Sequence, residues 1–130
     1  MSEKSWWNAY LERKHGAGLV ALTTEVEELS HCHVISASGK LTIDSSPELL
    51  ERIRESLKRT TCLKLDLKGV HYIDSSGIAT LIRGLKLAQE QSAGYVLVDP
   101  SPKVLAVIEL SQLQDFFVIE PSTEASVPQP

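Results

Sequence analysis

Residues 63–78 read LKLDLKGVHYIDSSGI, and this stretch decides the fold because it passes from a strand pattern to a helix start. Between Cys62 and Leu67 the apolar side chains alternate with polar ones, as in a strand that buries one face. Beyond Gly77 the apolar residues recur at helical spacing: Ile78, Leu81, Ile82, Leu85 and Ala88. Residues 69–77 are therefore predicted to link a strand to a helix.

Upstream of this stretch, two strands and a helix are predicted. Residues 19–26 and 31–37 are rich in β-forming residues, and the acidic pair Glu27 and Glu28 between them predicts the turn of a hairpin. Gly39 is expected to break the second run. Ser46 is then expected to cap a helix with Pro47 at its first position.

Downstream, residues 92–94 are expected to end the second helix, and residues 95–98 form a compact apolar run typical of a covered strand. Ser101 and Pro102 repeat the pattern of a cap followed by proline before a third helix, and residues 116–119 are predicted as the last strand. The order ββαβαβαβ predicts an α/β fold. We expect a mixed, mostly parallel sheet flanked by helices, with the hairpin at one side.

Length and composition are those of one globular domain. The chain has 130 residues, of which 42% are hydrophobic and only 5% aromatic, so the core is expected to be aliphatic. The expected organisation is an N-terminal extension over residues 1–18, a domain over residues 19–120 and a disordered, proline-containing tail over residues 121–130.

Charge and apolar content exclude several classes of partner. A net charge of -4 argues against direct binding to nucleic acid. The longest apolar runs are too short for a membrane helix, and no signal-peptide core is visible at the N-terminus. Cys32 and Cys62 are therefore interpreted as reduced, mostly buried thiols of a cytoplasmic protein.

The extension is unusual because it holds Trp6, Trp7 and Tyr10 in a polar stretch. On a helix, Trp7, Tyr10, Leu11 and Lys14 would share one face. Two interpretations stay open. The segment packs onto its own domain or onto a second copy, giving a homodimer through Trp6 and Trp7, or it contacts a partner or a membrane surface.

The tetrad Asp74, Ser75, Ser76 and Gly77 is the candidate site. Asp and Ser at this position cap a helix by accepting hydrogen bonds from its first N–H groups. Three such residues exceed that need. Because a helix N-terminus also stabilises a phosphate, a phosphoserine switch is the second interpretation.

The same run, residues 63–78, resembles the STAS domain of bacterial anti-sigma factor antagonists, and the resemblance extends over about residues 19–120. It implies a non-enzymatic binding protein whose Ser75, with Ser76 as the alternative, is phosphorylated by an anti-sigma factor serine kinase. The unmodified form binds that kinase, the phosphorylated form releases it, and a serine phosphatase resets the switch. We expect the partner surface to include Thr42, Ile78, Ala79, Ile82 and Arg83.

One position departs from the family pattern. Signalling members usually carry an acid at the position of Thr42, and the nearest acid here is Asp44. The alternative function is therefore a STAS scaffolding or regulatory subunit of a membrane complex that transports phospholipids or anions.

No cofactor, metal or catalytic site is predicted. His31 and His33 would project from one side of a strand with Cys32 on the other, but no third ligand is evident. The sequence has no G-x-S-x-G nucleophile turn and no glycine-rich nucleotide motif, so no enzyme activity is expected.

Overall fold

The fold is a five-stranded mixed sheet with helices packed against it. A computed structural model describes residues 22–121 of the chain. Its elements are β1 (Leu22–Glu28), β2 (His33–Leu41), α2 (Ser46–Leu57), β3 (Cys62–Ile73), α3 (Ser75–Glu90), β4 (Gly94–Val98), α4 (Pro102–Leu110) and β5 (Val118–Glu120). This confirms the predicted order ββαβαβαβ. The expected extension and all of the expected tail except Pro121 lie outside the described residues.

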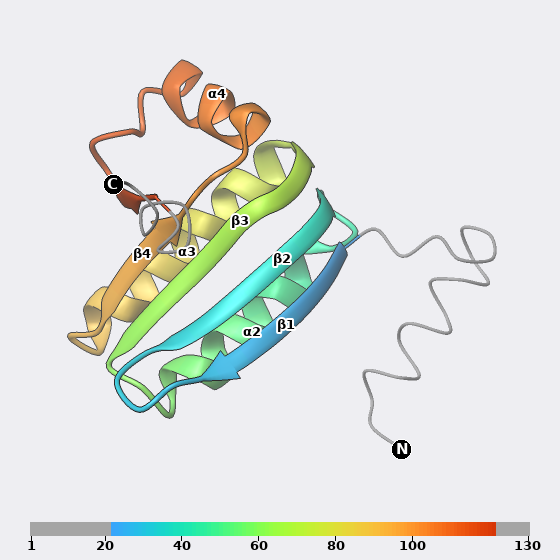
Figure 1. The fold of residues 1–130 in the computed structure, drawn as a ribbon. Helices are drawn as coiled ribbons and strands as arrows, with labels where there is room; N and C mark the ends of the chain where they lie inside the picture. The colour runs from blue at the N-terminus through green and yellow to red at the C-terminus, as the bar shows by residue number, and fades with distance from the viewer. Residues whose placement is uncertain (1–21, 122–130) are drawn as a thin grey trace, which may run out of the picture.

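The strands lie side by side in the order β1-β2-β3-β4-β5. β1 is antiparallel to β2, and every other neighbouring pair is parallel. The predicted hairpin at one side of a mostly parallel sheet is therefore confirmed. In Figure 1, α2 and α3 lie behind the sheet, and α4 lies beside the upper end of β3. The chain reaches α3 directly from the carboxyl end of β3.

The core is aliphatic, as predicted. Its largest fully buried side chains are Ile35, Leu41, Leu49, Ile53, Leu63, Leu65, Leu67, Leu81, Leu97, Ile108, Val70 and Val104. Each such side chain contributes about 1.5–3 kcal/mol when it leaves water. The aromatic Tyr95 is also buried, and its hydroxyl donates to the carbonyl of Leu81 at 2.9 Å. Desolvation raises the pKa of Tyr95 above its ordinary value, so the phenol stays protonated.

The turn of the hairpin differs from the prediction. Glu28 belongs to β1 and pairs with His33, and the turn lies over residues 29–32, where the amide of Leu29 donates to the carbonyl of Cys32 at 2.9 Å. The acidic pair does not form the turn. β1 is an edge strand, where charged side chains point to water at little cost and help to block unwanted strand pairing.

Two strands also run further than predicted. β2 continues past Gly39 to Leu41, and β3 continues through residues 69–73, which the sequence predicted to be a link. The register between β2 and β3 shifts twice, once between Ser36 and Ser38 and once after Gly39. Gly39 has φ 116°, a conformation suited to glycine at a bulge. These irregularities break the strict alternation that would have identified the strand ends.

Of the two predicted serine caps, the one at α2 is wrong and the one at α4 is confirmed. Ser45, and not Ser46, occupies the N-cap position of α2, and its hydroxyl donates to the carbonyl of Lys40 at 2.7 Å without capping the helix. At α4 the predicted cap is confirmed, because the hydroxyl of Ser101 accepts from the amide of Val104 at 3.3 Å.

The cysteines are joined, so the prediction of reduced thiols is wrong for this structure. Cys32 and Cys62 form a disulfide with a Cα–Cα distance of 4.6 Å. Cys32 immediately precedes β2 and Cys62 begins β3, and the next residues along, His33 and Leu63, pair across the two strands. The register thus makes neighbours of two residues that are 30 positions apart in the sequence.

Candidate functional site

The tetrad Asp74 to Gly77 lies where β3 ends and α3 begins. Asp74 occupies the N-cap position with an extended backbone, and its Oδ1 accepts from the amide of Gly77 at 3.0 Å. This is the geometry of a helix N-cap, which satisfies one of the N–H groups that the first turn leaves without a partner. The predicted capping role is therefore confirmed for Asp74.

Asp74 also joins the site to the neighbouring strand. Its Oδ2 accepts from the amide of Ile43 at 3.3 Å, and its own amide donates to the carbonyl of Leu41 at 3.2 Å. One side chain therefore holds the loop after β2 against the start of α3. This bridge explains why residues around Thr42, far away in the sequence, lie beside the tetrad.

The two serines have different surroundings. Ser75 is exposed, and its hydroxyl makes no hydrogen bond within residues 22–121. Ser76 is half-buried. Because Asp74 already caps the helix, the hydroxyl of Ser75 is not needed for that purpose. It lies at the N-terminus of α3, where backbone N–H groups and the helix dipole favour an added negative group.

Gly77 allows α3 to begin close to the sheet. A Cβ at this position would lie 2.7 Å from the carbonyl oxygen of Leu41 and 2.6 Å from a side-chain carbon of Ile73. Both distances are shorter than real Cβ contacts allow, so the close approach of α3 to β2 needs glycine here.

The expected partner residues divide into a surface group and a core residue. Ala79 and Arg83 are exposed, Ile82 and Thr42 are half-buried, and Ile78 is only 8% exposed and packs in the core. Ser75, Ala79 and Arg83 follow each other at intervals of four residues, so they share one face of α3.

The loop after β2 places Thr42 and Asp44 close to the tetrad. The hydroxyl of Thr42 accepts from the amide of Asp44 at 3.3 Å, and the amide of Thr42 donates to Ser45 Oγ at 3.0 Å. Asp44 is exposed. The nearest acid to Thr42 along this loop is therefore an exposed one, two residues further on.

Two exposed residues close to the tetrad were not predicted from the sequence. Ile43 is 69% exposed and Tyr72 is 48% exposed, and both lie within two residues of the paired Leu41 and Ile73. Ile43 had one sequence signal, an apolar residue in an otherwise polar loop. Tyr72 had none, because it was assigned to a link and not to a strand.

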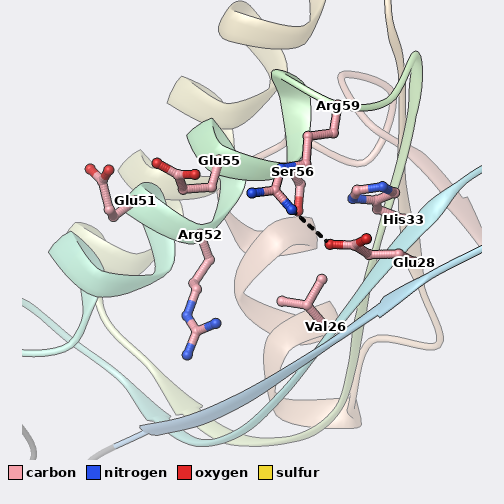
Figure 2. Close-up of a pocket in the computed structure, with 8 residues that line it drawn as sticks. All are labelled: Val26, Glu28, His33, Glu51, Arg52, Glu55, Ser56 and Arg59. Carbon is pink, nitrogen blue, oxygen red and sulfur yellow. Dashed lines mark hydrogen bonds and ion pairs between the residues drawn. The ribbon is translucent and has the colours of Figure 1, made fainter. Parts of the chain in front are cut away.

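A separate cleft lies between α2 and the hairpin (Figure 2). It has a volume of about 340 Å³ and is lined by Val26, Glu28, His33, Glu51, Arg52, Glu55, Ser56 and Arg59. Arg59 Nη1 lies 3.2 Å from Glu28 Oε2, which neutralises the charge at one side. Because Glu28 and His33 lie at the opposite end of the strands from Ser75, the cleft is distinct from the tetrad.

The expected pair of histidines on one strand is not present. His33 begins β2 and is buried, whereas His31 is exposed in the turn before it. Within residues 22–121 there is no group of three or more His, Cys, Asp or Glu side chains that could hold a metal ion. Over the same residues, every helix is too short or too polar to cross a membrane.

The chain belongs to the STAS domain family, whose family model matches residues 23–126. It is 22% identical over 106 residues to the anti-sigma-B factor antagonist of Bacillus subtilis (strain 168), covering 82% of this chain and 97% of that protein. Among solved structures, it resembles an anti-sigma factor antagonist from Mycobacterium paratuberculosis with 25% identity and a TM-score of 0.66, covering 80% of this chain and 89% of the other. The phosphorylated form of the Bacillus cell fate determinant SpoIIAA matches with 18% identity and a TM-score of 0.63, covering 81% and 96%.

Proposed function

We propose that this protein is an anti-sigma factor antagonist that is controlled by phosphorylation of Ser75. The observation that carries the proposal is the exposed hydroxyl of Ser75 at the N-terminus of α3, which makes no hydrogen bond within the described residues while Asp74 caps the helix. In this proposal the unmodified protein binds an anti-sigma factor serine kinase in the cytoplasm, and the sigma factor is released.

The similarity to named antagonists supports the same role. The relative from Bacillus subtilis is matched over 97% of its length, so the similarity covers nearly all of a protein named an antagonist. SpoIIAA, which shares the fold, exists in a phosphorylated form. Of the two serines, the exposed Ser75 is the preferred acceptor in this proposal, with the half-buried Ser76 as the alternative.

The chemistry of the switch follows from the charge that a phosphate adds. A phosphoserine carries about -1.5 to -2 charges at neutral pH. At Ser75 the helix N-terminus stabilises this charge, while the partner surface formed by Ala79, Ile82 and Arg83, which carries the positive charge of Arg83, changes to a net charge of about -0.5 to -1. A kinase whose surface fits the unmodified face would then have to bury a dianion next to Asp74, which disfavours the complex. A serine phosphatase restores the binding form.

The first experiment is an affinity capture from native lysate with identification by mass spectrometry. The variants are Ser75→Ala, which cannot be phosphorylated, and Ser75→Glu, which carries a permanent charge, with Ser76→Ala as the matched control. Wild type, Ser75→Ala and Ser76→Ala should each retain an ATP-binding serine kinase, and Ser75→Glu should retain at least about tenfold less, a difference of about 1.4 kcal/mol.

A second experiment tests the phosphorylation itself. Incubation of the captured kinase with ATP should add one phosphate to wild type and to Ser76→Ala but none to Ser75→Ala, as read by intact mass. Phosphate on Ser75→Ala would move the acceptor to Ser76. Equal recovery of transporter subunits by wild type and Ser75→Glu, without a kinase, would instead support the scaffolding function that Thr42 suggests.

A further inference from the structure

The cleft between α2 and the hairpin has polar side chains on both of its sides (Figure 2). Arg52 and Ser56 are four residues apart and share one face of α2, and Arg59 follows the end of that helix. His33 lines the opposite side from β2. It lies on the same side of its strand as the buried Ile35, so its imidazole points toward α2, as Figure 2 shows.

Two side chains of this cleft contain buried polar atoms that have no hydrogen-bond partner. Four enclosed side-chain polar atoms are without a partner among residues 22–121, and two of them, His33 Nδ1 and Arg52 Nε, belong to residues that line the cleft. His33 is only 6% exposed. A buried polar group without a partner costs free energy of folding, so each one calls for a physical reason. Two in one cleft indicate a site that is completed by a ligand.

The charges of the cleft favour an anion. Each of its three acidic side chains already pairs with a basic one, and the pairs are Glu28–Arg59 at 3.2 Å, Glu51–Arg54 at 3.9 Å and Glu55–Lys58 at 3.7 Å. Arg52, by contrast, forms no ion pair with any residue from 22 to 121. Four basic and three acidic side chains in and around the cleft give it a net formal charge of +1, whereas the whole chain carries -4. The excess charge is that of Arg52.

The types of side chain define the chemistry of the ligand. A guanidinium only donates hydrogen bonds, and its planar set of N–H groups matches a carboxylate or a phosphate. The imidazole of His33 can donate or accept one more hydrogen bond, and the half-buried Val26 adds an apolar surface. The volume of about 340 Å³ is at the lower end of the range of about 300–1,000 Å³ that is typical of small-molecule sites.

We propose that this cleft binds a small organic oxyanion, a carboxylate or a phosphate monoester on a short carbon skeleton. Its anionic group pairs with Arg52, and a second polar group of the same molecule hydrogen-bonds to the imidazole of His33. The site lies at the opposite end of the strands from Ser75. Binding here is therefore independent of the proposed antagonist function, and either proposal can fail without the other.

A nuclear magnetic resonance titration of the full ¹⁵N-labelled chain tests the site. The probes are succinate as the carboxylate, glycerol 3-phosphate as the phosphate monoester, and sodium chloride at matched ionic strength. At least one organic anion should shift the Nε–H resonance of Arg52 and the amide resonances of His33 and Ser56, with saturation in the millimolar range or below. The anion that saturates at the lower concentration identifies the oxyanion. Sodium chloride should give no saturation.

Three variants connect the binding to the named side chains. Arg52→Gln should weaken binding at least about tenfold, because a hydrogen bond to a charged group is lost. His33→Phe keeps an aromatic ring of similar size, and the loss of a neutral hydrogen bond should weaken binding about threefold to tenfold. Lys86→Gln is the matched control, because it removes one charge from an exposed position on α3 that does not line the cleft, and its affinity should equal that of wild type.

The variants should stay folded. His33 Nδ1 and Arg52 Nε have no partner among the described residues, so their removal breaks no hydrogen bond of the protein. Thermal unfolding of Arg52→Gln and His33→Phe without added anion should give midpoints no lower than that of wild type. Ser75→Ala should bind the probes like wild type, which keeps this test separate from that of the proposed function.

Three results would overturn the proposal. The first is a wild-type titration in which neither organic anion gives a saturating shift, and this reading needs no variant. The second is saturation that maps to residues 74–77 and leaves the resonances of His33 and Arg52 unchanged, which would assign the anion to the start of α3. The third is an Arg52→Gln variant that binds as tightly as Lys86→Gln, which would make the effect one of overall charge.

Discussion

The two ends of the sheet are built in different ways. At the amino ends of β2 and β3, the Cys32–Cys62 disulfide joins the strands covalently, and the amide of Gly94 adds a hydrogen bond of 2.8 Å to the carbonyl of Thr61. At the carboxyl ends, the loop after β2 is held to α3 mainly through Asp74, and the hydroxyl of Ser75 makes no hydrogen bond to any residue between 22 and 121. The amino ends of the two strands are therefore joined covalently, whereas the end that carries Ser75 is joined by hydrogen bonds and packing.

The largest effect is expected at the disulfide end. Replacing both cysteines, Cys32→Ser with Cys62→Ser, should lower the free energy of unfolding by about 3–4 kcal/mol, because the cross-link closes a loop of about 30 residues that loses entropy in the unfolded chain. Urea unfolding measures the change. Reduction with dithiothreitol should lower the stability of wild type by a similar amount and leave the double variant unchanged.

If reduction left wild type as stable as before, the disulfide would contribute nothing and the contrast between the two ends would fail. The affinity for the kinase partner proposed above provides a second reading, because the disulfide lies at the far end from Ser75. Binding by the folded double variant should match that of wild type.

The next effect is expected at the carboxyl end. Gly77→Ala should destabilise the fold by about 1–3 kcal/mol, since the new Cβ would press on the backbone of Leu41 and on Ile73. Gly94→Ala is the matched control, because the nearest atom to its Cβ would be 3.8 Å away. Thermal unfolding of the two variants should therefore differ, with Gly94→Ala close to wild type. A neutral Gly77→Ala would show that α3 can move away from β2 at little cost.

The contrast also shows which features the sequence could reveal. The order of elements and the tetrad were predictable because periodicity and capping are local: the apolar spacing after Gly77 and the acid at Asp74 are both visible within one turn of helix. The cap at Ser101 was found in the same way. The strand ends at Leu41 and Ile73 were not found, because bulges at residues 36–40 interrupt the alternation on which strand prediction rests.

Contacts between residues far apart in the chain could not be predicted from the sequence. The disulfide depends on the register of β2 against β3, which no local pattern specifies. The bridge from Asp74 to the amide of Ile43 joins residues 31 positions apart, so the exposed Ile43 could not be assigned to the site beforehand. Likewise, only the structure shows that Asp74 caps α3 and leaves the hydroxyl of Ser75 exposed.

The smallest effect is expected from removing the cap itself. Asp74→Ala should lower the free energy of unfolding by about 0.5–2 kcal/mol, because the amides of Gly77 and Ile43 both lose their acceptor. Hydrogen exchange should speed up at these two amides and stay unchanged at Gly94, whose partner is at the disulfide end. Asp74→Asn keeps an acceptor oxygen for the cap and should lose less.

A neutral Asp74→Ala variant would point to a substitute cap, and the exposed hydroxyl of Ser75, the next residue along the chain, is the first candidate. In that case Ser75→Ala added to Asp74→Ala would cost more than it does in wild type, and urea unfolding of the single and double variants measures this coupling. Additive losses would instead show that the hydroxyl takes no part in capping. That result would leave Asp74 as the group that positions the helix and Ser75 as the group available for modification.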